Sequence, residues 1–484
     1  MYAQLPMPHD PQFGVTNGAD ASSLPGSESG EGLIRGLGLK EATAANVVEM
    51  VGIGPFITIP ILLTFMGGPQ ALLGWLVGAL LAVSDGMVWA ELGASMPGAG
   101  GSYRYLREAY GANQMGLMMS FLFVWMILFT APLSAATGAV GFAEYLQYLV
   151  PNLSPLTTKV IAVAVVLAIT ALLYRNIKTV GRLSFWLMLV VLGSILWVIL
   201  SGLFSLKLDL LLDFPRDAFS FSKEFFVGLG SASLIAIYGY GGYNNVCFLG
   251  GEVKEPSKNI PRAIVFSILL VAVLYFFMTV SIIGVVPWRE AMQSPHVVSD
   301  FMELIYGSWA GRVLTVLILG AAFASVFALL LGYTRIPYAA AADGRFFRVF
   351  ARLHPTQRFP HVSVILLGLV STFFCFFELE EIIQILMVIQ IIVLYLAQVF
   401  AVTLIRRRSD INRPFQMWLY PLPSFLAAGG WLYILFTQEW RFIAWGVAVL
   451  GAGIGLYLLR AKYQAEWPFA PAGETYGGAS RGGE

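Results

Sequence analysis

Apolar residues fill most of the chain in long runs that are separated by short polar connections. A helix needs about 20 apolar residues to cross the hydrocarbon core of a bilayer. By that length the sequence predicts an all-α membrane protein with about twelve transmembrane helices. The predicted spans lie at residues 42–66, 69–95, 114–147, 157–174, 180–204, 225–250, 263–286, 313–340, 362–379, 381–405, 418–437 and 441–460.

The remaining stretches give the domain organisation. Residues 1–33 and 464–484 are polar and Gly-rich, which predicts two disordered tails around a single transmembrane domain at 34–463. The first tail lacks a cationic start followed by an apolar run, so we expect no cleavable signal peptide. The stretch from His296 to Gly311 alternates apolar and polar residues at helical spacing. It predicts an amphipathic helix on the outer surface between the seventh and eighth spans.

Lys and Arg are divided unevenly between the connections, and this division predicts the orientation. The even-numbered connections hold Arg104, Arg107, Arg175, Lys178, Arg182, Lys254, Lys258, Arg262, Arg335, Arg345, Arg348, Arg352, Arg358, Arg406, Arg407, Arg408 and Arg413. The odd-numbered connections hold Lys159, Lys207, Arg216, Lys223, Arg289, Arg312 and Arg441. We therefore expect a multi-pass protein of an inner or plasma membrane with both termini in the cytoplasm.

Composition agrees with this class and excludes others. The chain of 484 residues is 58% hydrophobic and 12% charged, whereas soluble domains are about 25% charged. Its net charge of +1 does not suggest a nucleic-acid surface. The histidines lie in tails or connections, and we find no metal-ligand spacing, nucleophile elbow or phosphate-binding loop. We expect no enzyme activity, no cofactor and no metal. The sequence also has no repeated carbonyl loop of the kind that forms the selectivity filter of a channel.

Two spans are interrupted by Gly and Pro. The first is broken at Gly52-Ile53-Gly54-Pro55 and the sixth at Gly239-Tyr240-Gly241-Gly242. Such breaks free backbone groups, which membrane interiors tolerate only inside protein or along a cavity. Packing glycines and a proline kink would explain either break alone. Two breaks five spans apart instead predict a five-plus-five inverted repeat, spans 1–5 against 6–10.

The broken helices predict where a substrate binds. The N–H groups of Ile53 and Gly54 are expected to donate to a carboxylate at a helix N-terminus. Free carbonyls near Val51 suit an ammonium group. The predicted substrate-binding residues are Val51, Gly52, Ile53, Gly54, Ile237, Tyr238, Gly239, Tyr240, Tyr243 and Asn244. For the tyrosines, aromatic packing is the alternative.

Charged residues inside spans are few, and Glu49 and Asp85 are therefore functional candidates. A carboxyl group that gains and loses a proton near the site would couple transport to protons. The alternative for Glu49 is a structural hydrogen bond to a neighbouring helix. The alternative for Asp85 is a pair with a hydroxyl group or a cytoplasmic cation.

Several motifs, in order and at the expected spans, resemble the amino acid–polyamine–organocation superfamily of transporters over residues 35–460. Gly52-Ile53-Gly54-Pro55-Phe56 is similar to its G-x-G-x-F break in span 1. Further matching segments are Ala90-Glu91-Leu92, Pro97 to Tyr103, Tyr240 to Tyr243, Gly251 to Pro256, Ile260-Pro261, Arg335, Ala341 to Gly344 and His354-Pro355. The resemblance implies the five-plus-five fold with two further helices.

Within the superfamily, bacterial amino acid permeases and the plant-type polyamine branch both remain open. Glu49 with Gly52, Gly54, Pro55 and Phe56 matches the span 1 pattern of the polyamine branch. Many members have Ile or Val where Pro55 stands, so one possible carboxylate donor is missing here. The span 5 Lys of some proton-coupled members is also absent. Ser325 falls where sodium-coupled relatives offer a hydroxyl ligand, although helix packing is the simpler role for it.

These observations predict a secondary transporter that moves amino acids by alternating access, coupled to protons through Glu49 or working as an exchanger. Uptake of polyamines or cationic amino acids is the nearest alternative, and a non-transporting receptor on the same fold is a second. The expected partners are a small-molecule substrate and the lipid bilayer. The sequence assigns neither a monomer nor an oligomer.

Overall fold

The computed structural model describes residues 35–98, 100–175, 180–356 and 359–469, and for residues 175 and 180–188 it describes the backbone alone. The expected tail at 1–33 and residues 470–484 of the expected C-terminal tail lie outside the described residues, as do Lys178 and Arg358. Every regular element in the described ranges is a helix, apart from an isolated bridge between Leu37 and Val253. The all-α class is therefore confirmed.

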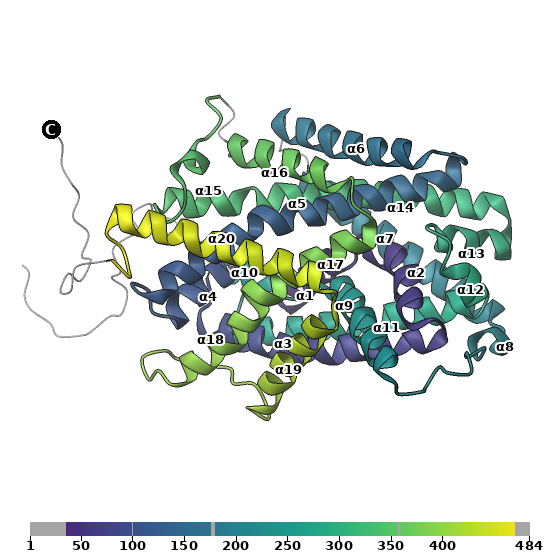
Figure 1. Ribbon diagram of the computed structural model, residues 1–484, viewed down its shortest axis with the longest axis horizontal. Helices are drawn as coiled ribbons and strands as arrows, with labels where there is room; N and C mark the ends of the chain where they lie inside the picture. Colours follow the sequence, from purple (N-terminus) through teal and green to yellow (C-terminus); the bar gives the residue numbers. More distant parts are fainter. Residues whose placement is uncertain (1–34, 99, 176–179, 357–358, 470–484) are drawn as a thin grey trace, which may run out of the picture. The chain divides into compact units, whose positions relative to one another are not determined.

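The helices follow the predicted spans in order (Figure 1). The first half of the chain contains α1 (Leu39–Met50), α2 (Gly54–Met66), η1 (Pro69–Ala71), α3 (Leu72–Ser95), α5 (Met115–Leu149), α6 (Pro155–Arg175) and α7 (Val180–Ser205). The next helices are α9 (Lys223–Tyr240), α10 (Asn245–Phe248), α11 (Pro256–Ile283), α14 (Ser308–Tyr333) and α15 (Arg335–Ala342). Then come α16 (His361–Phe374), α17 (Leu379–Gln390), a π-helical turn (Ile391–Tyr395), α18 (Leu396–Arg406), α19 (Leu422–Thr437) and α20 (Trp440–Gln464). The connections hold α4 (Ser102–Ala109), α8 (Leu208–Leu211), α12 (Trp288–Ala291), α13 (Val297–Tyr306) and η2 (Arg348–Ala351).

Seven of the described helices are long and apolar enough to cross a membrane, and the bent pair α1–α2 makes an eighth span if it is counted as one. Shorter apolar helices occupy Leu189–Ser205, His361–Phe374 and Leu422–Thr437. In place of the sixth predicted span, α9 begins with Lys223 and Glu224 and stops at Tyr240. The structure therefore confirms many spans, and the number twelve stays a prediction.

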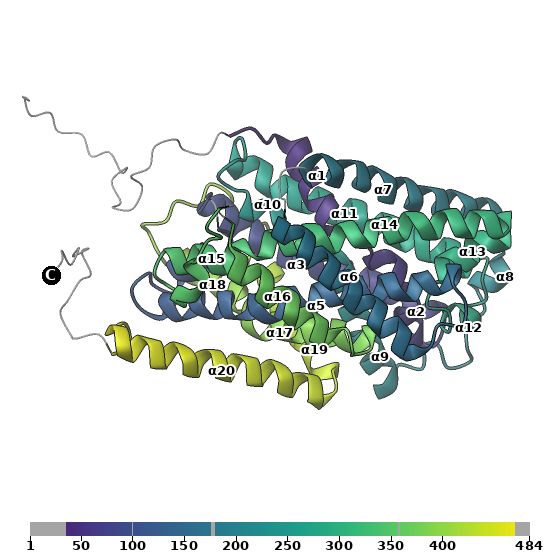
Figure 2. The same ribbon diagram turned by 90° about the horizontal axis from the view of Figure 1, so that it is seen from above.

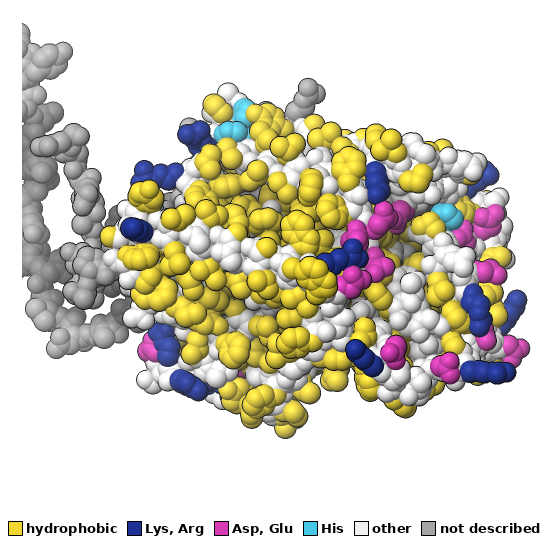
Figure 3. Space-filling view, viewed as in Figure 1, with side chains coloured by type: hydrophobic (Ala, Val, Ile, Leu, Met, Phe, Trp, Pro, Cys, Tyr) yellow, Lys and Arg dark blue, Asp and Glu magenta, His cyan; other side chains and the backbone are white. Residues whose placement is uncertain are grey.

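The outer surface of the helices is apolar, as a lipid-facing surface requires. Figure 3 shows hydrophobic side chains gathered over the middle of one face, with most of the charged side chains toward its ends. Trp440 is 80% exposed, Phe436 76% and Leu369 62%. Exposed apolar surface on this scale marks membrane contact in a protein of this class. Figure 2 shows α20 at one side of the bundle, where it packs against α5 and α17.

Small residues bring the helices close together in the interior. α3 packs against both α9 and α11. A Cβ atom added to Gly74 would lie 3.0 Å from the Cβ of Ala232, and one added to Gly78 would lie 2.8 Å from the Cβ of Ala236. Without a hydrophobic driving force between helices in lipid, such close backbone approach is a main source of packing energy. It also places α9 firmly against the span that carries Asp85.

The predicted amphipathic helix is α13, and it is shorter than expected. Val297, Val298 and Phe301 are buried, while Glu303 and Leu304 face solvent. The helix ends at Gly307, whose φ of 88° is in the region that favours glycine. The residues from Ser308 onward belong to α14 instead.

Both predicted breaks are present. α1 and α2 are bent by 53° relative to each other across Val51, Gly52 and Ile53. The second break falls two residues later than expected, at residues 241–244, because Gly239 and Tyr240 complete the last turn of α9. Gly242, with φ of 111°, turns the chain.

The halves of the two broken spans pack crosswise. α1 lies against α10 and α11, while α2 lies against α9. Each half of the first span thus meets the opposite half of the sixth, an arrangement that suits the predicted inverted repeat. The repeat itself stays a prediction.

Candidate functional site

The N-terminus of α2 offers backbone donors that the described residues leave unused. The N–H groups of Gly52, Ile53 and Gly54 donate no hydrogen bond to any described residue, and the first paired N–H is that of Phe56, at 3.0 Å from the carbonyl of Ile53. Pro55 has no N–H, but the three residues before it supply three donors. The partial positive charge of a helix N-terminus adds to them. This end of α2 is suited to an anionic group.

The end of α1 offers free carbonyl acceptors, in contrast to the free N–H donors at the start of α2. The carbonyls of Val48 and Glu49 accept no hydrogen bond from the described residues, and Pro55 cannot donate to the carbonyl of Val51. The carbonyl of Met50 accepts from the Tyr275 hydroxyl at 2.8 Å. At the end of α9, the carbonyl of Tyr238 accepts from Gly241 N at 3.0 Å. Free carbonyls therefore lie next to free N–H groups, which is the pairing that a zwitterion needs.

Glu49 lies between the two breaks. A Cβ atom on Gly242 would come within 2.6 Å of the Glu49 Cγ, so only glycine allows this approach. Glu49 is exposed to solvent, and its carboxylate has no ion pair or hydrogen bond with a described residue. The structure therefore gives an accessible carboxylate that is free to meet water or a ligand.

Asp85 is fully buried and is already satisfied. Its Oδ2 accepts from the Tyr243 hydroxyl at 2.6 Å, and its Oδ1 accepts from the Trp431 Nε1 at 2.9 Å. The Trp431 ring stacks on Tyr395 with centroids 4.2 Å apart. Both donors to Asp85 are neutral. The first is the hydroxyl alternative that the sequence left open.

The three predicted tyrosines face different surroundings. Tyr238 is half-buried, and a Cβ atom on Gly54 would lie 3.9 Å from its ring, so it lies beside the first break. Tyr240 is buried, donates to the carbonyl of Trp75 at 3.1 Å and stacks on Tyr275. Tyr243 points to Asp85. The structure therefore brings the ring of Tyr238 alone to the break, and it directs the other two into helix contacts.

The remaining predicted residues divide in the same way. Ile237 is buried in α9, and Gly239 allows Trp75 and Tyr275 to approach, at 3.2 and 3.3 Å from an added Cβ atom. Asn244 is half-buried just before α10, and its side chain forms no hydrogen bond with the described residues. Asn244 is therefore available to a ligand near the second break.

Ser325 on α14 reaches the first break. A Cβ atom on Gly52 would lie 2.9 Å from its Oγ, and the hydroxyl has no hydrogen-bond partner among the described residues. Its position beside free carbonyls agrees with an ion ligand and equally with close packing against a glycine. Its role stays a prediction.

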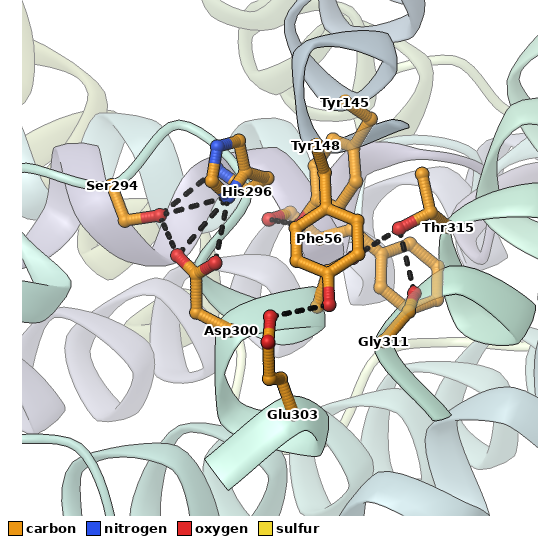
Figure 4. Close-up of polar contacts among 10 residues, drawn as sticks. Phe56, Tyr145, Tyr148, Ser294, His296, Asp300, Glu303, Gly311 and Thr315 are labelled. Carbon is orange, nitrogen blue, oxygen red and sulfur yellow. Dashed lines mark hydrogen bonds and ion pairs between the residues drawn. The ribbon is translucent and has the colours of Figure 1, made fainter. Parts of the chain in front are cut away.

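Two residues that hold the breaks were missed by the sequence analysis. Tyr145 of α5 donates to the carbonyl of Phe56 at 2.7 Å (Figure 4). That carbonyl lacks its usual partner because Pro60 stands four residues later in α2. Asn46, buried in α1, bonds to both sides of the second break. Pro60 and a lone amide in an apolar span were the available signals.

Figure 4 also shows how α13 is tied to α5, since the Tyr148 hydroxyl of α5 donates to Glu303 of α13 at 2.6 Å. Within the α13 segment, the His296 Nδ1 lies 2.9 Å from Asp300. Since Tyr145 and Tyr148 are one turn apart on α5, this helix contacts both α2 and α13 at the same end.

A separate cavity lies between α5, α6 and the connection from α16 to α17. Its lining includes Glu144, Thr158, Lys159 and Glu378. None of the predicted substrate-binding residues lines it. Within the ranges that the structure describes, no cluster of three or more His, Cys, Asp or Glu residues is placed to hold a metal ion.

Comparison with known proteins decides the family. The chain matches the Amino acid permease family over residues 37–456. It is 25% identical over 422 residues to the serine/threonine exchanger SteT of Bacillus subtilis, covering 84% of this chain and 91% of that one. It is 24% identical to the branched-chain amino acid permease BcaP of Bacillus subtilis, covering 90% of this chain and 95% of that one. It is 27% identical to the human large neutral amino acids transporter small subunit 2, covering 92% and 85%.

This chain belongs to the Amino acid permease family. The resemblance to the amino acid–polyamine–organocation superfamily is thereby confirmed. The protein is a multi-pass membrane transporter of amino acids and not an enzyme. The relatives named above do not favour the polyamine alternative.

The contacts of Tyr243 generate a prediction that separates packing from substrate binding. Tyr243→Phe removes one of the two hydrogen bonds to buried Asp85, so we expect it to lower the free energy of unfolding by about 1–3 kcal/mol. Because the hydroxyl is already bonded to Asp85, the KM for amino acid uptake should stay within about threefold of wild type. Thermal unfolding and uptake into proteoliposomes measure the two effects. A large rise in KM at unchanged stability would place Tyr243 in the substrate pocket instead.

Proposed function

We propose that this permease is a secondary transporter that binds an amino acid at the two breaks and carries it by alternating access. The unused N–H groups of Gly52, Ile53 and Gly54 carry the proposal. Inside a membrane protein, three neighbouring donors without partners are costly unless a ligand or water occupies them. A substrate carboxylate satisfies all three at a helix N-terminus.

The free carbonyls at the end of α1 complete the site. The carbonyls of Val48 and Glu49 supply acceptors for the substrate ammonium group. Tyr238 and Asn244 are placed to contact the substrate side chain. The relatives' names specify serine, threonine, branched-chain and large neutral amino acids. Neutral amino acids are accordingly the substrates that we propose.

Glu49 is the proposed coupling group. It is accessible to solvent, has no cationic partner among the described residues, and contacts the second break at Gly242. Its position next to both breaks allows the protonation state to affect the geometry of the substrate site. Asp85, held by two neutral donors, is the less accessible of the two acids. We further propose that both termini lie in the cytoplasm, on the side of the Arg-rich connections.

The position of Gly54 allows a direct test of the site. A valine Cβ at this position meets only the Tyr238 ring at 3.9 Å, so the helix can accept it, but its methyl groups fill the space beside the free N–H groups. We expect Gly54→Val to raise the KM at least tenfold, which is about 1.4 kcal/mol of lost binding, with a nearly unchanged melting temperature. Gly320→Val is the matched control, because a Cβ atom at Gly320 of α14 has no neighbour within 4 Å. Equal KM values for the two variants would argue against this placement of the substrate.

The coupling role of Glu49 is tested by Glu49→Gln. In proteoliposomes with an acidic outside, we expect the variant to lose uptake driven by the pH gradient. Exchange of labelled for unlabelled amino acid at equal pH should remain within about threefold of wild type, because the backbone donors are intact. Glu144→Gln, which changes an acid in the separate cavity, should retain gradient-driven uptake. Full gradient-driven uptake by Glu49→Gln would remove Glu49 from the coupling mechanism.

A further inference from the structure

Asn46 is a fully buried amide in the first half of the first span. Its Nδ2 donates to the carbonyl of Tyr243 at 2.7 Å and to the Ser267 Oγ at 3.2 Å. Its Oδ1 accepts from the N–H of Val246 at 2.8 Å. One side chain thus contacts the second break and α11 together.

The backbone hydrogen bonds around the second break explain why the carbonyl of Tyr243 and the N–H of Val246 need a partner. Across the break, Asn245 N donates to Gly242 and Cys247 N donates to Asn244. The carbonyl of Tyr243 and the N–H of Val246 are left over between these two bonds. Asn46 supplies one donor and one acceptor to this pair, in the way that a neighbouring peptide group would. An amide is the side chain that combines both functions without charge.

Asn46 and Glu49 lie three residues apart on α1 and therefore share one face of the helix. Asn46 holds Tyr243 and Val246, while Glu49 contacts the adjoining Gly242. The following turn of the chain carries the free N–H groups of Gly52, Ile53 and Gly54. The bonds of Asn46 consequently fix the second break against the span whose own break provides the donors.

We propose that Asn46 is a positioning residue for transport, which holds the two breaks in the register that lets one amino acid contact both. Asn46 does not touch the substrate in this account. It acts through Tyr243 and Val246, which set the end of α9 and the start of α10. The inference rests on the proposed location of the substrate at the breaks.

Asn46→Leu and Asn46→Asp test this role in the purified full-length protein, by exchange of labelled amino acid in proteoliposomes at equal pH on both sides. Asn46→Leu keeps the approximate volume and removes both hydrogen-bonding functions, so we expect the KM to rise at least tenfold. Asn46→Asp keeps the acceptor, and its protonated form regains a donor. At pH 5.5 the KM of Asn46→Asp should be within threefold of the wild-type KM at the same pH. At pH 7.5 the ratio of the two KM values should be larger.

Asn245→Leu is the matched control. The Asn245 Nδ2 donates to the carbonyl of Ala45 at 3.2 Å. The variant therefore removes a side-chain hydrogen bond between the same two segments, and it leaves the hydrogen bonds of Asn46 to Tyr243 and Val246 intact. We expect its KM to stay within threefold of wild type. If Asn46→Leu only destabilised the protein, the melting temperature and the amount of active protein would fall. A stability loss alone would not raise the KM of Asn46→Leu, and it would not bring the KM of Asn46→Asp near the wild-type value at pH 5.5.

A KM of Asn46→Leu within threefold of wild type would overturn the proposal. So would an Asn46→Asp variant that is as impaired as Asn46→Leu at pH 5.5, and this second comparison still decides the matter if Asn46→Leu does not fold. Gly54→Val separates the two levels of the argument. If Gly54→Val raises the KM and Asn46→Leu does not, only the role of Asn46 fails; if neither variant changes it, the substrate lies elsewhere.

Discussion

The structure depends on one constraint, which is that a polar backbone group inside a membrane needs a partner. A continuous helix meets this constraint by itself, and most spans of this permease do so. The first and sixth spans do not, because Gly and Pro interrupt them near the middle. Each interruption leaves N–H and C=O groups that lipid cannot satisfy. The chain must therefore supply partners from other helices or keep these groups for a ligand.

Four of the released groups find partners on neighbouring helices. Tyr275 binds the carbonyl of Met50, Tyr145 binds that of Phe56, and Asn46 binds two groups at the second break. These contacts come from α11, α5 and α1, so the breaks are held on several sides. The N–H groups of Gly52, Ile53 and Gly54, at the N-terminus of α2, have no such partner among the described residues. These free donors, next to the free carbonyls of Val48 and Glu49, are what supports a substrate site there.

The sequence predicted the features that depend on composition and on local backbone chemistry. The apolar runs and the Gly and Pro residues were sufficient to predict an all-α membrane protein with two broken helices, and the breaks lie within two residues of their predicted positions. Side-chain directions were beyond reach, because they depend on which helices become neighbours. Tyr240 and Tyr243 therefore looked equivalent to Tyr238, although only the last lies at the first break. Asn46 was missed for the same reason, since its partners are about 200 residues away in the chain.

The proposed site recognises the carboxylate and the ammonium group of one amino acid together. Thermal unfolding of the purified wild-type protein tests this with neutral amino acids, each compared with the amine that lacks its carboxylate and the acid that lacks its ammonium group. A ligand that binds only the folded state raises the melting temperature. At a ligand concentration of 100 times its Kd, it adds about 2.7 kcal/mol to the free energy of unfolding. We predict stabilisation by amino acids and little or none by either analogue. Equal stabilisation by the amine would contradict carboxylate capture at Gly52, Ile53 and Gly54.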